Sequence, residues 1–166
     1  MAGKGPRGGA GQNGRMSRRK PRPRTAPARA AAPAPAPALG PDAPCPCGSA
    51  AAYGQCCGRF HSGVERAPTA ERLMRSRYSA FVVRDEGYLL RTWAAATRPR
   101  SVDFDPETRW TGLEVLDTTD GTLFHTTGTV TFAAHYTHAG EPGALRERSR
   151  FEKDGGAWVY VDGTFD

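Results

Sequence analysis

Four cysteines are the residues of this chain whose type and spacing suggest chemistry most directly. They lie in the stretch CPCGSAAAYGQCC, where Cys45 and Cys47 are one residue apart, eight residues follow, and Cys56 and Cys57 are adjacent. A loop this short has no hydrophobic core of its own, so it needs a cross-link to hold one conformation. Four thiolates in a tetrahedron are a usual ligand set of structural zinc. Because four protein ligands fill such a site, the pattern indicates a structural site and not a catalytic one.

Other uses of the cysteines stay open at this point. Disulfides are disfavoured in the cytoplasm, and a bridge between the neighbours Cys56 and Cys57 would be strained. A redox pair usually has the spacing Cys-x-x-Cys, which this run lacks, and iron–sulfur clusters usually have longer spacings. His61 is also near enough in the sequence to replace Cys57 as the fourth ligand.

The basic charge of the chain is concentrated before the cysteines. The formal net charge is +6, yet residues 1–44 hold nine Lys or Arg and one acid, whereas the remainder holds fourteen basic and sixteen acidic residues. Residues 1–43 are rich in Gly, Pro, Ala and Arg and poor in large apolar side chains, which predicts a disordered tail. Nucleic-acid binding through this tail is the weakest functional hypothesis, because a run of charge is usually a solvated extension.

The sequence has no segment typical of a membrane span or a secretory signal. A span needs about 18 consecutive apolar residues. The segment RAAAPAPAPALG, which follows the basic N-terminus, consists of Ala and Pro where a signal peptide would have Leu or Val. We therefore expect a cytoplasmic protein with no membrane partner.

After the cysteines, the chain is predicted to form two helices and then a series of strands. Apolar residues recur at helical spacing from Thr69, and Asp85 can cap a second, shorter helix. Beyond Pro99, alternating segments are separated by turn signals: TGLEVLD, TLFHTTGTVTFAAHY, ALRERSRFEK and AWVYVDGTF. Helices followed by a strand meander predict an α+β domain, with helices packed on one face of an antiparallel sheet.

A family resemblance rests on the cysteine run and four later segments. The stretch PCPCGSAAAYGQCCG resembles the SEC-C zinc motif, known from the C-terminal tail of the SecA translocation ATPase. LMRSRYSAF, YLLRTW, ERSRF and WVYVDGT then follow in the order seen in the YchJ-like family of small bacterial proteins. The chain is similar to this family over about residues 44–165.

The resemblance implies both a fold and a ligand set. It implies a SEC-C zinc knuckle at residues 44–62 and a cystatin-like or nuclear-transport-factor-2-like (NTF2-like) cone at residues 66–166, with helices on a curved antiparallel sheet. It also implies structural zinc on Cys45, Cys47, Cys56 and Cys57. It implies no settled biochemical activity.

A second candidate site lies in the predicted hairpin near the C-terminus. If Asp154-Gly155 forms a two-residue turn, Glu147 pairs with Asp162 on the face that also carries Tyr160. These three residues are therefore candidates for a ligand-binding or proton-transfer site in the cone.

Two neighbouring acids are unfavourable unless one is protonated or a cation lies between them. Arg75 or Arg77 from the first predicted helix could supply that cation. Because perturbed acids are also common in structural networks, the favoured interpretation is a buried ion-pair cluster that joins helix to sheet, or solvent exposure of the acids if the register slips by one residue.

These features favour a binding or adaptor protein over an enzyme. The knuckle is expected to contact a protein or ribosomal surface, by analogy with the SecA motif, which contacts the chaperone SecB. The alternative is a small-molecule-binding protein or enzyme with a pocket at Glu147, Tyr160 and Asp162.

Overall fold

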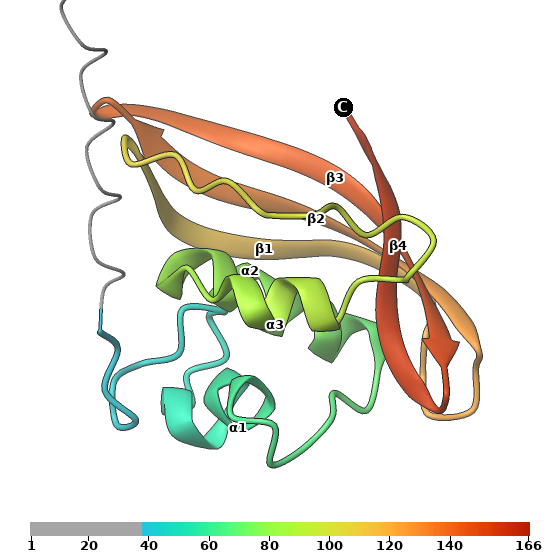
Figure 1. The fold of residues 1–166 in the computed structure, drawn as a ribbon. Coiled ribbons are helices and arrows are strands. Elements are labelled where there is room, and N and C mark those ends of the chain that lie inside the picture. Colours follow the sequence, from blue (N-terminus) through green and yellow to red (C-terminus); the bar gives the residue numbers. More distant parts are fainter. Residues whose placement is uncertain (1–37) are drawn as a thin grey trace, which may run out of the picture. The chain divides into compact units, whose positions relative to one another are not determined.

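A computed structural model of the chain describes residues 38–166. Residues 1–37, which make up most of the predicted tail, lie outside the described residues. The elements in order are η1 (Tyr53–Gln55), α1 (Cys57–His61), α2 (Ala70–Val83), α3 (Glu86–Arg91), β1 (Thr108–Asp120), β2 (Thr127–His138), β3 (Glu141–Asp154) and β4 (Ala157–Phe165). Helices α2 and α3 lie along one face of the sheet (Figure 1), which confirms the predicted α+β fold. Within the described residues, no helix has the length and hydropathy to cross a membrane.

Both predicted helix starts are confirmed by side-chain caps. The Thr69 hydroxyl accepts a hydrogen bond from the Arg72 amide at the start of α2, at 3.1 Å. The Asp85 carboxylate accepts one from the Tyr88 amide at the start of α3, at 2.8 Å. Such caps satisfy amide groups that have no partner inside the helix, so the short α3 can begin directly after α2.

The four strands form an antiparallel meander in the order β1-β2-β3-β4. Ala139-Gly140 links β2 to β3, and both residues have positive φ angles, as a tight two-residue turn requires. The segment TLFHT (residues 122–126), predicted as the start of a strand, instead forms most of the connection between β1 and β2, and β2 begins at Thr127. In this connection the His125 ring accepts a hydrogen bond from the Thr122 amide, which stabilises a turn in place of a strand.

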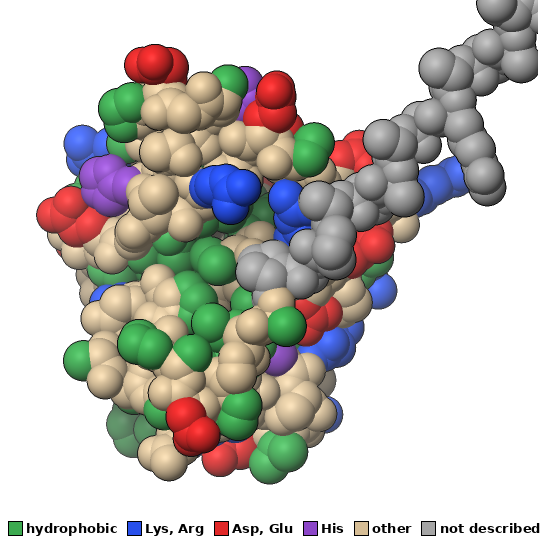
Figure 2. Space-filling view, turned by 90° about the vertical axis from the view of Figure 1, so that its left-hand side faces the viewer, with side chains coloured by type: hydrophobic (Ala, Val, Ile, Leu, Met, Phe, Trp, Pro, Cys, Tyr) green, Lys and Arg blue, Asp and Glu red, His purple; other side chains and the backbone are tan. Residues whose placement is uncertain are grey.

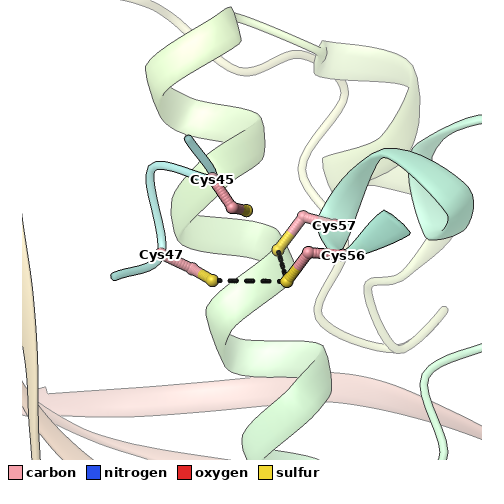
Figure 3. Close-up of side chains that lie close together, drawn as sticks. All are labelled: Cys45, Cys47, Cys56 and Cys57. Carbon is pink, nitrogen blue, oxygen red and sulfur yellow. Dashed lines mark hydrogen bonds between the residues drawn. The ribbon is translucent and has the colours of Figure 1, made fainter. Parts of the chain in front are cut away.

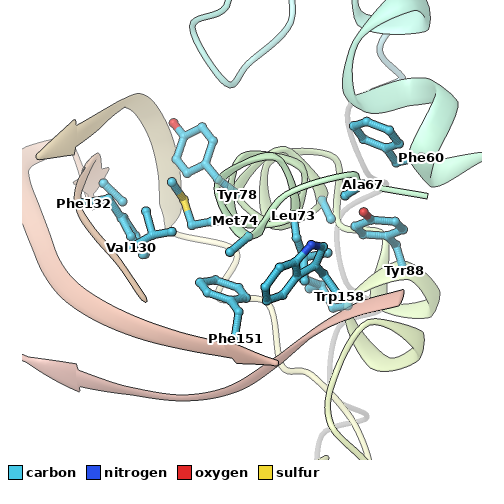
Figure 4. Packing of buried hydrophobic residues seen from close by; sticks show 14 residues of the cluster. Phe60, Ala67, Leu73, Met74, Tyr78, Tyr88, Val130, Phe132, Phe151 and Trp158 are labelled. Carbon is cyan, nitrogen blue, oxygen red and sulfur yellow. The ribbon is translucent and has the colours of Figure 1, made fainter. Parts of the chain in front are cut away.

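The hydrophobic core lies between α2 and the sheet. Figure 4 shows the packing of Leu73, Met74 and Tyr78 from α2 against Val130, Phe132, Phe151 and Trp158 from the strands. Buried and more exposed residues alternate along β2, as expected for a sheet with one face against the core. Seen from one side, hydrophobic side chains also gather around a hollow in the surface, with charged side chains near its rim (Figure 2).

Leu73→Ala should be strongly destabilising. The Leu73 side chain is 1% exposed, and a buried Leu→Ala change leaves a cavity that typically lowers the free energy of unfolding by about 2–5 kcal/mol. Leu116→Ala is the matched control, because Leu116 is 40% exposed and should change the free energy by only about 0.5 kcal/mol. Urea unfolding of both variants measures the difference; equal effects would contradict the described packing of α2.

Candidate metal centre and ligand cavity

The four cysteine sulfurs form one compact cluster. All lie within 4.8 Å of one another, and the Cys47–Cys56 and Cys56–Cys57 sulfur distances are 3.6 and 3.9 Å (Figure 3). Four sulfurs bound about 2.3 Å from one central ion in a tetrahedron would stand about 3.8 Å apart. The cluster therefore has the size that a single tetrahedral metal ion requires.

Two short turns bring the cysteines together. The Gly48 amide donates to the Cys45 carbonyl at 3.2 Å, and Gly48 has φ +77°, so the first pair sits on a tight turn that favours glycine. Cys56 directly follows η1 and Cys57 begins α1, which places the second pair at the junction of two helical turns. The Cys45 amide donates to the Ala51 carbonyl at 2.9 Å and thereby closes the loop between the pairs.

Electrostatics inside the cluster call for a cation. The four residues are 0–5% exposed, and hydroxyl groups lie beside two of the sulfurs: Ser49 is 3.0 Å from Cys56 and Ser79 is 3.8 Å from Cys45. Hydrogen bonds from Cys47 and Cys57 lower the pKa of the Cys45 thiol, because they stabilise its thiolate. The same hydrogen bond between Cys57 and Cys45 raises the pKa of the Cys57 thiol, which keeps its proton. One thiolate is thus stabilised by its neighbours, but further thiolates would repel it unless a metal ion lies between them.

His61 lies outside the sulfur cluster and has a different role. Its Nε2 is 2.8 Å from the Ser76 carbonyl oxygen, and its Nδ1 is 2.7 Å from the Tyr53 hydroxyl. Because a carbonyl only accepts, Nε2 carries the proton, and Nδ1 accepts from Tyr53. Burial lowers the pKa of His61, in keeping with a neutral ring. The structure therefore groups Cys57, not His61, with the other three cysteines.

The knuckle is held against α2 and α3 by two arginines. The Arg75 guanidinium donates to the Cys47 carbonyl at 2.9 Å and to Glu71 at 2.8 Å. Arg91 donates to the carbonyls of Phe60 and His61 at the end of α1. Arg75, considered from the sequence as a cation for the cone, is thus engaged at the metal cluster instead.

The predicted pairing of β3 with β4 is wrong. The turn lies at Gly155-Gly156, both with positive φ, and Phe151 pairs with Tyr160. Beyond this pair, a bulge leaves Val161 without a partner in β3 and shifts the register by one residue. A shift of one residue moves a side chain to the other face of a sheet, so the residues after the bulge face the opposite way from the prediction.

The predicted acid pair is consequently absent. Asp162 pairs with Arg150, whose Nε donates to its carboxylate at 2.6 Å, and both side chains are solvent-accessible. Glu147 instead pairs with Phe165 and is buried, 8% exposed. Its side chain lies over Gly163, where a Cβ atom would come within 2.0 Å of Oε1, so any larger residue at position 163 would displace the acid.

Glu147 and Tyr160 do come together, as the sequence suggested. Glu147 Oε1 accepts hydrogen bonds from the Tyr160 hydroxyl at 3.1 Å and from the Ser149 hydroxyl at 2.6 Å. Burial and the neighbouring Glu147 raise the pKa of Tyr160, which keeps the hydroxyl protonated and able to donate.

Arg77 is the second charged side chain at this site. Its guanidinium lies 4.9 Å from the ring centre of Trp93 and 4.6 Å from that of Tyr160, and its NH1 donates to the Leu89 carbonyl and the Thr92 hydroxyl. Burial lowers its pKa to about 10, so the group stays charged at neutral pH. Its position is fixed by these contacts and does not involve an ion pair with Glu147.

These side chains line a cavity of about 270 Å³ between α2 and the sheet. Its walls are mainly aromatic: Tyr78, Trp93, Trp110, Phe132, Phe151 and Tyr160. Glu147, Ser149 and Arg77 supply the polar part of the lining. Ligand cavities commonly combine apolar walls with a few convergent polar groups in this way.

Sequence reasoning missed some of these residues. Trp110 and Trp93 were not assigned to the site, since they lie on separate elements far from Glu147 in the sequence. No local pattern marks these two tryptophans, because only the packing of separate elements brings them to the cavity that contains Glu147.

The fold and site define a class: an NTF2-like α+β domain that carries an N-terminal cysteine knuckle. The family model described as "YchJ, middle NTF2-like domain" matches residues 69–163, and that of the SEC-C motif matches residues 43–59. The chain belongs to this YchJ-like family, which confirms the resemblance seen in the sequence.

Similar proteins carry names without a stated activity. A UPF0225 protein of Streptomyces avermitilis is 66% identical over 71% of this chain and 81% of its own length, and one of Streptomyces coelicolor is 63% identical over 71% and 92%. Among solved structures, a SEC-C motif containing protein from Rhodopseudomonas palustris has a TM-score of 0.66 at 32% identity, covering 74% of this chain and 98% of that one. A SEC-C motif containing protein from Psychrobacter arcticus has a TM-score of 0.61 at 31% identity, with coverages of 74% and 82%.

Cys57→Ser and His61→Gln should separate the two possible fourth ligands. Cys57→Ser removes a sulfur from the cluster and should weaken Co²⁺ binding at least tenfold, with a weaker and shifted visible absorption of the cobalt complex because three thiolates remain. His61→Gln removes only a ring outside the cluster, so the Co²⁺ affinity of this variant should stay within about threefold of that of the original protein. Metal titration against a competing chelator measures both; strong loss in His61→Gln with full binding in Cys57→Ser would contradict the assignment.

Proposed function

We propose that this protein binds a small organic molecule in the cavity of its NTF2-like domain and that a structural zinc ion on the four cysteines fixes the knuckle to that domain. The observation that carries the binding role is the cavity itself, in which a buried acid meets aromatic walls. A cone filled with side chains would have opposed this role.

Zinc is the metal that suits the cysteine cluster best. Soft thiolate ligands select zinc, copper(I) or iron–sulfur clusters, and tetrahedral four-sulfur sites point to zinc or iron. Sulfurs 3.6–3.9 Å apart leave room for one ion and not for a cluster of several atoms. The protein would work in a reducing compartment such as the cytoplasm, where neighbouring thiols remain free to bind metal.

The zinc ion has a structural part in this proposal. Four protein ligands leave no position for water or substrate, and the cluster is nearly inaccessible to solvent. Binding energy of a structural metal becomes folding energy, so the ion stabilises the knuckle and its contacts with α2.

The cavity beside Glu147 is a better candidate than the larger hollow of about 850 Å³ nearby. The polar residues that line the larger hollow include Asp103, Asp105 and Arg109, and all three are exposed. In water, charges of this kind contribute little to binding, whereas a buried polar group discriminates strongly between ligands. Binding is the role that we propose for this cavity, in which the Tyr160 hydroxyl donates to Glu147 and Arg77 is held in place by its own contacts.

The protein or ribosomal partner predicted from the SEC-C resemblance stays a prediction. The cysteines face α2, so a partner would meet the outer side of the knuckle and not the metal ion. The prediction of nucleic-acid binding concerns the basic tail, and residues 1–37 of this tail lie outside the part of the chain that the structure describes.

Ala134→Met should block the cavity. Ala134 is a buried residue of the cavity wall, and a flexible methionine can fill the adjoining space. We expect toluene, a neutral aromatic probe, to shift NMR signals of residues around the cavity, and Ala134→Met to weaken its binding at least tenfold.

Ala133→Met is the control for this experiment, since the neighbouring side chain faces the other side of β2 and is not part of the cavity lining. Its toluene affinity should match that of the original protein. Absence of toluene binding to the original protein, or equal binding by all three proteins, would contradict the proposed function.

A further inference from the structure

We infer that the cavity selects small planar aromatic molecules that carry positively charged N–H donors, such as an amidine, and that Glu147 is the residue that recognises them. This inference rests on the proposed ligand-binding function and names the ligand class. It follows from the charge, hydrogen bonding and burial of the groups that line the cavity.

Glu147 has an unused hydrogen-bonding atom. The hydroxyls of Ser149 and Tyr160 both donate to Oε1, while Oε2 makes no hydrogen bond to any of residues 38–166. The two hydroxyls orient the carboxyl group and keep it in one position on the cavity wall. Oε2 is not among the fully buried polar atoms that lack a partner within residues 38–166, so a ligand in the cavity can reach it. A carboxylate oxygen in such a largely apolar site forms stronger hydrogen bonds to ligand N–H groups than it would in water.

Glu147 also has no cation in contact among the described residues. None of the ion pairs within residues 38–166 includes it, although Arg77 lines the same cavity. Arg77 is anchored by the Leu89 carbonyl and the Thr92 hydroxyl and lies against two aromatic rings. Arg77 interacts with Glu147 electrostatically but makes no hydrogen bond to it, so a charged ligand can supply the direct, charge-assisted hydrogen bonds that Arg77 does not make to this acid.

The walls determine the shape of the ligand. Aromatic rings from α2, from the segment after α3 and from all four strands face the cavity, and the volume of about 270 Å³ suits a molecule built around one ring. Planar rings pack against such walls, and the faces of aromatic rings also attract cations. The buried Trp93 Nε1 has no hydrogen-bond acceptor among residues 38–166, but it is enclosed by protein atoms and so does not contribute to recognition.

Three probes of nearly equal size test this inference: benzamidine, benzamide and benzoate, which carry positive, zero and negative charge. Isothermal titration of the full chain with each should give at least tenfold tighter binding of benzamidine than of benzoate. Glu147→Gln keeps the size of the side chain and removes the acid, so it should weaken benzamidine binding at least tenfold and change benzamide binding by less than threefold.

Glu152→Gln is the matched control. Glu152 lies on the same strand but is exposed, so its substitution should leave the affinities of all three probes unchanged. The comparison among the probes needs no variant, so it decides the question even if Glu147→Gln fails to fold.

The outcomes separate the ligand class from the binding function. Equal affinities, or tighter binding of benzoate through Arg77, would overturn the assignment of Glu147 while leaving a cavity that binds toluene. Failure of toluene and all three probes to bind would overturn both proposals.

Discussion

The crowding of four thiols into one buried cluster is the constraint on which the rest of this structure depends. Sulfurs within 4.8 Å of one another can all be thiolates only around a cation, because unscreened like charges would raise the pKa of each successive group. A loop that brings them together without a core of its own would be held by such an ion and by its contacts with the domain. A metal ion bound there would act as a disulfide cross-link does in an oxidising compartment.

Helix α2 joins this site to the cavity. Arg75 binds the Cys47 carbonyl on one side, while Arg77, two residues later, lines the cavity on the other side. Met74 and Tyr78 of the same helix also form cavity wall. Because residues two positions apart point to different sides of a helix, one short segment contacts the knuckle and shapes the cavity. A metal ion bound by the cysteines would thus stabilise the helix that carries much of the proposed binding site, without touching the ligand.

Local sequence features predict the parts of this fold that depend on neighbouring residues. The cysteine cluster and the helix caps at Thr69 and Asp85 are of this kind. The register of β4 does not follow from local sequence. The segment DGG contains two overlapping residue pairs, Asp154-Gly155 and Gly155-Gly156, and both suit a tight two-residue turn. The bulge at Val161 cannot be predicted from local sequence either. It accompanies backbone hydrogen bonds of Tyr160 to residues 92 and 94, which follow α3 and are far away in the sequence. This bulge turns Asp162 outward, so the predicted acid pair is replaced by a single buried acid.

The most direct test of this account is X-ray absorption at the zinc edge, measured on the chain purified under reducing conditions. The account predicts one zinc ion per chain, bound by four sulfur atoms at about 2.3 Å, with no nitrogen ligand. This result would establish the ion around which the knuckle and α2 are organised. A chain that folds fully without metal, or a site with three sulfurs and a histidine nitrogen, would contradict it.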